Sequence, residues 1–208
     1  MTNYQNYKNI IFDFGGVLLE IDYRKTEDAF CELMGDGSHA GFSQASQSDL
    51  FNLIEVGAIS NDAFRQGLRD LFQKSDVSDR ELDLAWNALL GTIPRDWFEH
   101  VKAVGETRRI FLLSNTNAIH LDEVYREMER SLGSVEAFES AFEKVYYSHR
   151  LGLRKPHREI FETVIQENQL DPKDTLFIDD SIQHIQGAKE LGLGTHHLTG
   201  LITDLQFL

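Results

Sequence analysis

Short apolar segments alternate with helical patterns along this 208-residue chain, and this alternation is what most constrains the fold. Runs typical of strands buried on both faces occur at residues 9–13, 109–114, 144–148 and 175–179, with a weaker fifth at 194–198. Helical patterns occupy residues 94–104, 117–128, 156–168 and 181–191. Strands that alternate with helices favour parallel βαβ units, so we predict an α/β fold built on a doubly wound parallel sheet.

The gap between the first two predicted strands is too long for a single crossover. About 95 residues follow Asp13 before the next strand, whereas a βαβ unit needs roughly 30. The excess contains four helical patterns, at residues 24–34, 47–57, 60–72 and 78–90, and Ser78 with Glu81 forms a capping box for the last. We therefore predict a core domain of residues 1–19 and 94–208, and an inserted helical subdomain of residues 20–93.

The four stronger strand segments share one feature, a polar residue at the carboxyl end. These residues are Asp13, Ser114, Ser148 and Asp179. Open α/β sheets bind ligands beyond the carboxyl ends of their strands, where the loops separate. We expect Asp13, Ser114 and Asp179 to meet at one edge of the sheet, with the helical subdomain beside it.

Composition excludes several kinds of partner. The chain carries 34 acidic and 20 basic residues, a formal net charge of −14, which disfavours a nucleic-acid partner. No apolar run approaches the roughly 20 residues of a membrane span, and the first residues lack a signal-peptide pattern. With Cys31 as its single cysteine the chain forms no internal disulfide. We expect a cytoplasmic protein, monomeric or homodimeric, with a small-molecule substrate and no membrane or nucleic-acid partner.

Four sequence motifs carry a resemblance to a known family. They are IIFDFGGVL (residues 10–18), FLLSNTN (111–117), RKPHREIF (154–161) and FIDDSIQHIQGAKELG (177–192). In order and context they resemble the four motifs of the haloacid dehalogenase (HAD) superfamily, which implies a Rossmann-like core with the insertion as a first-type helical cap. The segment LSNTNAIH (113–120) further resembles the sugar-phosphatase branch that includes α-D-glucose-1-phosphate phosphatases.

The resemblance implies a Mg²⁺-dependent phosphatase that acts on a small phosphorylated metabolite, such as a sugar phosphate. Asp13 would be the nucleophile and would form an aspartyl-phosphate, which divides one difficult displacement into two easier ones. Mg²⁺ would lie between Asp13, Asp180 and the backbone carbonyl of Gly15, with Asp179 in support, because hard cations prefer oxygen ligands. The metal would reduce the repulsion between the attacking carboxylate and the phosphate.

Further residues would hold the transferring phosphoryl group. The resemblance assigns its oxygens to Ser114, Asn115 and the backbone amide of Gly16, where glycine permits a close approach. Lys155 would be the permanent cation that balances the charge of the group.

One acidic residue that the family uses is missing. Phosphatases of this superfamily usually have an aspartate two residues after the nucleophile, as general acid and base, and this chain has Gly15. General acid catalysis contributes typically 10²–10⁴-fold, so its loss favours substrates whose leaving group departs easily, such as sugar 1-phosphates. Asp22 and His157 are the candidate substitutes for the missing acid.

The histidines give weaker signals. His184 stands where many relatives have asparagine or aspartate, in a position that orients Lys155 or a loop at a strand end. His120, His196 and His197 lack the spacing of metal ligands, so we expect them to be structural or surface groups.

Two other functions remain open. A 2-haloacid dehalogenase also lacks the second aspartate, because a halide leaves without a proton, but those enzymes need no metal and have little use for the Asp179–Asp180 pair. The third alternative is a catalytically weak binding or regulatory protein that lost activity with the acid. Metal-dependent phosphate release, chloride release, and binding without turnover would distinguish the three.

Overall fold

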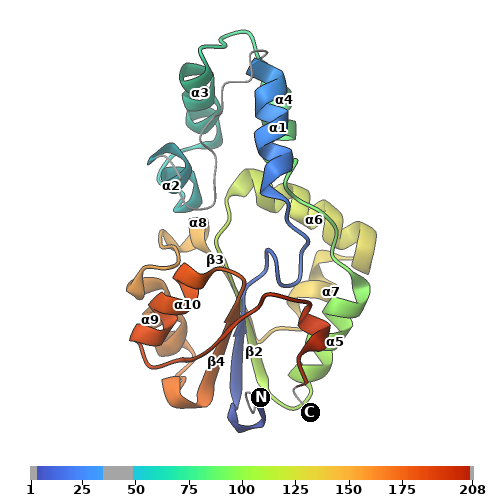
Figure 1. The fold of residues 1–208 in the computed structure, drawn as a ribbon, viewed down its shortest axis with the longest axis vertical. Helices are drawn as coiled ribbons and strands as arrows, with labels where there is room; N and C mark the ends of the chain where they lie inside the picture. The colour runs from blue at the N-terminus through green and yellow to red at the C-terminus, as the bar shows by residue number, and fades with distance from the viewer. Residues whose placement is uncertain (1–3, 35–48, 207–208) are drawn as a thin grey trace.

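A five-stranded parallel sheet forms the centre of the protein (Figure 1). The computed structural model describes residues 4–34 and 49–206. The strands are β1 (Asn9–Phe12), β2 (Arg109–Ser114), β3 (Lys144–Tyr147), β4 (Thr175–Asp179) and β5 (Gly194–His197), in the spatial order β3-β2-β1-β4-β5. All five lie where the apolar segments predict them, so the predicted α/β fold with a parallel sheet is confirmed.

Helices cover both faces of the sheet. On one side lie α5 (Arg95–Gly105), α6 (Ala118–Leu132) and α7 (Val135–Glu139), and on the other α9 (Arg158–Glu167) and α10 (Ile182–Glu190). Strand β1 shows why both faces must be covered. Ile10 and Phe12 pack in the cluster of the first side, whereas Ile11 packs in that of the second.

The helices lie at the predicted patterns with boundaries shifted by a few residues, and the shortest helices were not predicted. Helix α9 begins at Arg158 with His157 at its N-cap position, so Pro156 precedes the helix. The short helix α7 was not predicted, since five residues give too little periodicity to recognise. Short segments complete the core: α8 (Ser148–Leu151) after β3, and the 3₁₀ turns η1 (Tyr4–Asn6), η2 (Pro172–Asp174) and η3 (Ile202–Asp204).

In the part of the chain that the structure describes, four further helices lie beyond the carboxyl ends of the strands, at the top of Figure 1. These inserted helices are α1 (Tyr23–Met34), α2 (Asp49–Glu55), α3 (Asn61–Phe72) and α4 (Asp79–Asn87). They share a hydrophobic cluster that includes Phe30, Phe51, Phe64 and Trp86, and the Ser78–Glu81 capping box begins α4 as predicted. Residues 35–48 of the predicted subdomain lie outside the described residues, and the division at residues 20 and 93 stays a prediction.

The chain leaves and re-enters the core at one place. Glu20 donates its N–H to the carbonyl of Thr92 (2.9 Å), and Gly91 donates to the carbonyl of Glu20 (2.8 Å). Ile21 and Leu90 form an antiparallel bridge beside them. The two connections therefore pair with each other, which fixes the base of the inserted helices above the sheet. None of the helices within residues 4–34 and 49–206 has the length and hydropathy needed to cross a membrane.

Candidate active site

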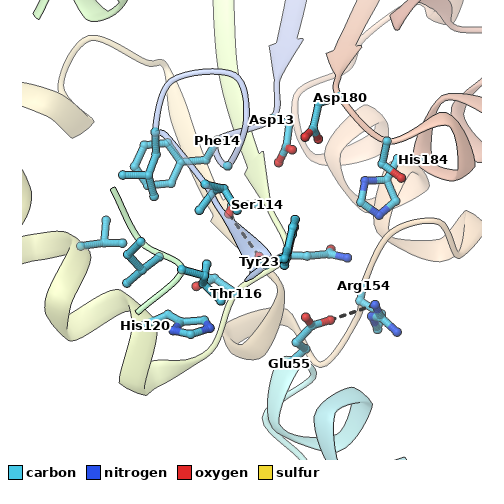
Figure 2. Close-up of a pocket in the computed structure, with 18 of the residues that line it drawn as sticks. Asp13, Phe14, Tyr23, Glu55, Ser114, Thr116, His120, Arg154, Asp180 and His184 are labelled. Carbon is cyan, nitrogen blue, oxygen red and sulfur yellow. Dashed lines mark hydrogen bonds and ion pairs between the residues drawn. The ribbon is translucent and has the colours of Figure 1, made fainter. Parts of the chain in front are cut away.

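A cavity of about 280 Å³ lies between the carboxyl ends of the strands and the inserted helices (Figure 2). The core contributes the predicted site residues Asp13, Gly15, Ser114, Asn115 and Asp180 to its lining. The inserted helices contribute Tyr23, Asn52, Glu55, Trp86 and Leu89. The strand register explains the meeting of the acidic residues. Phe12 pairs with Ile178, so Asp13 and Asp179 follow adjacent strands at the same level.

Lys155 lies behind the cavity wall, with no exposed side-chain surface. Its ammonium donates to Asp13 Oδ1 (2.6 Å), Asp179 Oδ2 (2.8 Å) and the carbonyl of Leu113 (2.9 Å). Burial alone would lower the pKa of Lys155, but the two carboxylates outweigh it and hold the pKa above its usual value. All three N–H donors are in use. The predicted contact between Lys155 and a phosphate oxygen would need one of these three N–H groups to change its partner.

Asp13 and Asp180 lie in a crowded acidic environment. Burial, then repulsion from Asp179, raises the pKa of Asp13 to about 7. The same two causes raise the pKa of Asp180 to about 6. Three carboxylates thus surround the one ammonium of Lys155, and the group has a surplus of negative charge. Such a surplus of carboxylate oxygens fits a divalent hard cation such as Mg²⁺.

Asp179 has its hydrogen-bonding capacity filled by protein groups. Oδ1 accepts from the backbone N–H of Ser181 (2.7 Å), Oδ2 accepts from Lys155, and Nδ1 of His184 lies 3.0 Å from both oxygens. Burial would raise the pKa of Asp179, but Lys155 and His184 lower it to about 2. Asp13, Asp179 and His184 offer ligand atoms within 4.8 Å of one another. Because Asp179 and His184 already satisfy each other, the donors best placed for a metal are Asp13 and Asp180. The predicted part of Asp179 in metal binding stays a prediction.

The two consecutive glycines have different structural roles. Gly16 has φ +75°, and a β-carbon there would lie 2.2 Å from Oδ2 of Asp180, so only glycine lets the two loops approach this closely. The Gly16 N–H donates to the carbonyl of Leu19 (2.8 Å), so the predicted phosphate contact of this amide is not open here. In the described part of the chain, the N–H groups of Phe14 and Gly15 and the Gly15 carbonyl form no backbone hydrogen bond. These two amides were not predicted as site groups, because only the path of the loop identifies them.

Asn115 holds the segment that carries Lys155. Its side-chain amide donates to the carbonyl of Lys155 (2.9 Å), and its Oδ1 accepts from the Lys155 N–H (2.9 Å). The predicted contact of Asn115 with phosphate would use its backbone N–H or the second N–H of its side-chain amide. Ser114 lines the cavity, and its hydroxyl makes only a long contact of 3.5 Å with the Asn115 carbonyl. Of the Ser114 and Asn115 side chains, that of Ser114 is therefore the better placed to bind a ligand.

Neither candidate substitute for the missing acid lines the cavity. The Asp22 carboxylate accepts from the backbone N–H of Arg24 (3.2 Å) just before α1. His157 is exposed at the start of α9.

Polar residues on the far side of the cavity were not predicted as site residues. Arg154 of the core pairs with Glu55 of α2 (2.9 Å) and hydrogen-bonds the side chain of Asn52. His120 of α6 lines the same cavity. In Figure 2 these residues lie away from Asp13 and Asp180. Arg154 and His120 stand within quoted motifs, but their meeting with Glu55 and Asn52 in one cavity depends on the packing of the inserted helices on the core.

Comparison with known proteins identifies relatives along nearly the whole chain. A family model of haloacid dehalogenase-like hydrolases matches residues 7–192. The chain is 32% identical over 188 residues to the D-ribitol-5-phosphate phosphatase of Bacteroides thetaiotaomicron, covering 90% of each protein.

Solved structures give the same result. A HAD-family enzyme from Bacteroides thetaiotaomicron, crystallised as a mutant with magnesium and inorganic phosphate, superposes with a TM-score of 0.84 and 34% identity. The match covers 92% of this chain and 93% of that one. A predicted HAD-like hydrolase from Porphyromonas gingivalis gives a TM-score of 0.79 and 29% identity over 92% and 90% of the two chains.

Proposed function

The chain belongs to the haloacid dehalogenase-like hydrolases, and on that premise we propose that it is a Mg²⁺-dependent phosphatase for a small phosphate ester that bears hydroxyl groups. One observation carries the proposal. Asp13 reaches the cavity beside Asp180, while Lys155 holds one of its oxygens at 2.6 Å. A carboxylate that is held on one oxygen and open on the other is suited to attack a phosphorus atom.

The first step transfers the phosphoryl group to Asp13. An oxygen of the Asp13 carboxylate forms a bond to phosphorus, and the bond from phosphorus to the ester oxygen breaks. The ester oxygen leaves with the bonding electron pair and takes a proton from water to give the free alcohol. In the second step water attacks the aspartyl-phosphate, which releases inorganic phosphate and restores Asp13. Lys155 and Asp179 position the nucleophile, and Asn115 positions Lys155 through its two backbone hydrogen bonds.

Mg²⁺ would be held by the carboxylates of Asp13 and Asp180 and by the Gly15 carbonyl. When bound, the ion withdraws charge from the phosphate and so lowers its repulsion of the attacking carboxylate. The N–H groups of Phe14 and Gly15 and the hydroxyl of Ser114 would donate to phosphate oxygens. Donors fixed by the fold need no rearrangement as charge develops on these oxygens.

The substrate class rests on three observations. The segment at residues 113–120 resembles that of sugar phosphatases, and the chain is similar to a D-ribitol-5-phosphate phosphatase. The cavity of about 280 Å³ combines polar groups with apolar walls from Leu89, Leu90 and Val124, which suits a short hydroxylated carbon chain.

The test is a phosphate-release screen over sugar, polyol and aryl phosphates, with Mg²⁺ and with excess EDTA. We expect turnover of p-nitrophenyl phosphate and of at least one polyol or sugar phosphate, abolished by EDTA and restored by Mg²⁺. Chloride release from 2-chloropropionate without phosphate release would instead support a dehalogenase. Binding of phosphate esters without turnover of any would contradict an enzymatic role.

A further inference from the structure

His120 is a buried histidine that the mechanism above does not use. It lies in the first turn of α6, is 8% exposed and lines the cavity. Its ring stacks on Trp86 with 4.5 Å between ring centroids and 18° between the planes. Its Nδ1 lies 2.7 Å from Oδ1 of Asn87. Both partners belong to α4, so an inserted helix fixes the orientation of a core side chain.

This hydrogen bond determines which ring nitrogen carries the proton. An amide oxygen only accepts, so Nδ1 of His120 donates to Asn87 and Nε2 keeps its lone pair. Burial lowers the pKa of His120 to about 3, which keeps the ring neutral. No group among the described residues hydrogen-bonds to Nε2. The ring therefore presents a fixed, neutral acceptor that the protein itself leaves unused.

We propose that Nε2 of His120 accepts a hydrogen bond from a hydroxyl group of the bound phosphate ester, and that His120 thereby selects polyol and sugar phosphates over esters without hydroxyl groups. The inference rests on the proposed phosphatase function and specifies its substrate recognition. A neutral acceptor attracts O–H donors and repels carboxylates, so a hydroxyl is the complementary group. A site built around a buried polar group discriminates against a ligand that leaves the group unpaired.

The placement of His120 within the cavity agrees with this role. Figure 2 shows His120 on the same side as Glu55 and Arg154, away from Asp13 and Asp180. A substrate with its phosphate at Asp13 would extend its carbon chain towards this side. Glu55 and Arg154 already hydrogen-bond or pair with protein groups, whereas Nε2 of His120 adds an acceptor without breaking a contact.

The acceptor depends on the packing of α4 against α6. Asn117, the N-cap of α6, accepts from the backbone N–H of His120 (3.0 Å) and from Nε1 of Trp86 (3.4 Å). If α4 moved away, His120 would lose its stacking partner and the acceptor that fixes its tautomer. Substrate recognition by His120 therefore depends on the contact between α4 and α6.

The experiment compares two esters that share a five-carbon chain and a primary leaving alcohol. D-Ribitol 5-phosphate carries hydroxyl groups, and n-pentyl phosphate carries none. We expect His120→Phe, which keeps an aromatic ring on Trp86, to lower the ratio of their kcat/KM values by roughly 10- to 100-fold. His120→Gln, which restores an acceptor, should retain the ratio within about 5-fold of the wild type. Asn87→Leu, which frees the tautomer without changing His120, should shift the ratio in the same direction as His120→Phe.

Controls separate this inference from the proposed function. Lys189→Gln, an exposed change in the last turn of α10 and outside the cavity, should leave the ratio unchanged. Equal losses on both esters in His120→Phe would overturn the selectivity role while leaving the phosphatase in place. Absence of turnover of p-nitrophenyl phosphate by the wild type would overturn the phosphatase itself. If circular dichroism shows that His120→Phe is not folded, the Asn87→Leu variant provides the test. An unchanged ratio of the two kcat/KM values in Asn87→Leu would then contradict the inference.

Discussion

The ammonium of Lys155 lies 2.6 Å from the carboxylate of Asp13, although 142 positions separate them in the chain. Both groups are buried, and neither could remain charged there alone. The pairing of β1 with β2 and β4 brings the loops that carry these groups to one edge of the sheet. The fold and the candidate site therefore depend on each other.

Replacement of Lys155 by methionine should destabilise the fold. The change leaves Asp13 and Asp179 buried without their cation, and breaking a buried pair from one side costs about 3–5 kcal/mol. Lys144→Met is the matched control, because Lys144 pairs with Glu167 at the surface and such pairs contribute about 0–1 kcal/mol. Urea unfolding measures both. Equal free-energy losses in the two variants would contradict the structural role of Lys155.

Thermal stability without metal should fall as pH rises. The folded-state pKa values of Asp13 and Asp180, about 7 and about 6, exceed the ordinary value of 3.8. The stability that the protonated Asp13 and Asp180 contribute to the folded state is therefore fully present below about pH 4 and is lost as pH rises through about 7. Mg²⁺ binds the deprotonated carboxylates, so its stabilisation should grow over the same range.

The measurement is the Tm at about pH 5 and about pH 8, with and without Mg²⁺. The metal should raise the Tm more at the higher pH. Asp180→Asn should remove most of the difference between the Mg²⁺-induced Tm shifts at the two pH values. An equal effect of Mg²⁺ at both pH values would place the metal elsewhere.

Restoring an acid with Gly15→Asp should help poor leaving groups most. Gly15 is outside the left-handed region, and a β-carbon there would lie 3.2 Å from Cγ1 of Ile21, so a small shift of Ile21 admits it. We expect turnover of primary-alcohol phosphates to rise roughly 10- to 100-fold, with little change for p-nitrophenyl phosphate, whose leaving group needs no proton. An equal rise in turnover of primary-alcohol phosphates and of p-nitrophenyl phosphate would show that the new aspartate does not act as an acid.

Gly16→Ala is the comparison for that variant. Its φ of +75° disfavours a side chain, and the new β-carbon would meet Oδ2 of Asp180. Magnesium-dependent activity should be lost, in contrast to Gly15→Asp. Full activity of Gly16→Ala would show that the close approach of Gly16 and Asp180 is not required.

The contact between the inserted helices and α8 should matter for turnover, because these helices line the cavity and so cover the carboxyl ends of the strands. Gly57 has φ +65°, and a β-carbon there would lie 2.3 Å from the carbonyl oxygen of His149. Gly133 has φ +98° but open space around it. Gly133→Ala should cost only the backbone strain, about 1–2 kcal/mol. Gly57→Ala should cost more and also lower kcat/KM, as steady-state kinetics and urea unfolding would show. Unchanged kcat/KM in Gly57→Ala would argue against a covering role.

The sheet could be predicted from sequence because each strand is a short apolar run with its own boundary signal. Asp13 at the end of β1 and Asp179 at the end of β4 were expected to meet, and they do. The Ser78 capping box is equally local and was also predicted. Apolar periodicity and hydrogen bonds between residues a few positions apart depend only on a short stretch of sequence. That stretch alone is therefore enough to predict them.

The remainder of the site depends on packing between distant segments. His120 looked like a structural or surface group, because its partners Asn87 and Trp86 lie on another helix more than 30 residues away. The Gly16 N–H donates to the Leu19 carbonyl because of the path of one loop. Residue types alone do not specify that path.

The central claim is that Asp13 carries the phosphoryl group during turnover. The most direct measurement is acid quenching in the first turnovers with a phosphate ester, followed by peptic digestion and mass spectrometry. We expect one added phosphoryl group, labile to hydroxylamine, on the peptide that contains Asp13. The modification should be absent from Asp13→Asn, which should also lose turnover of every substrate while keeping its fold. Phosphorylation of any other residue, or full turnover by Asp13→Asn, would contradict the account.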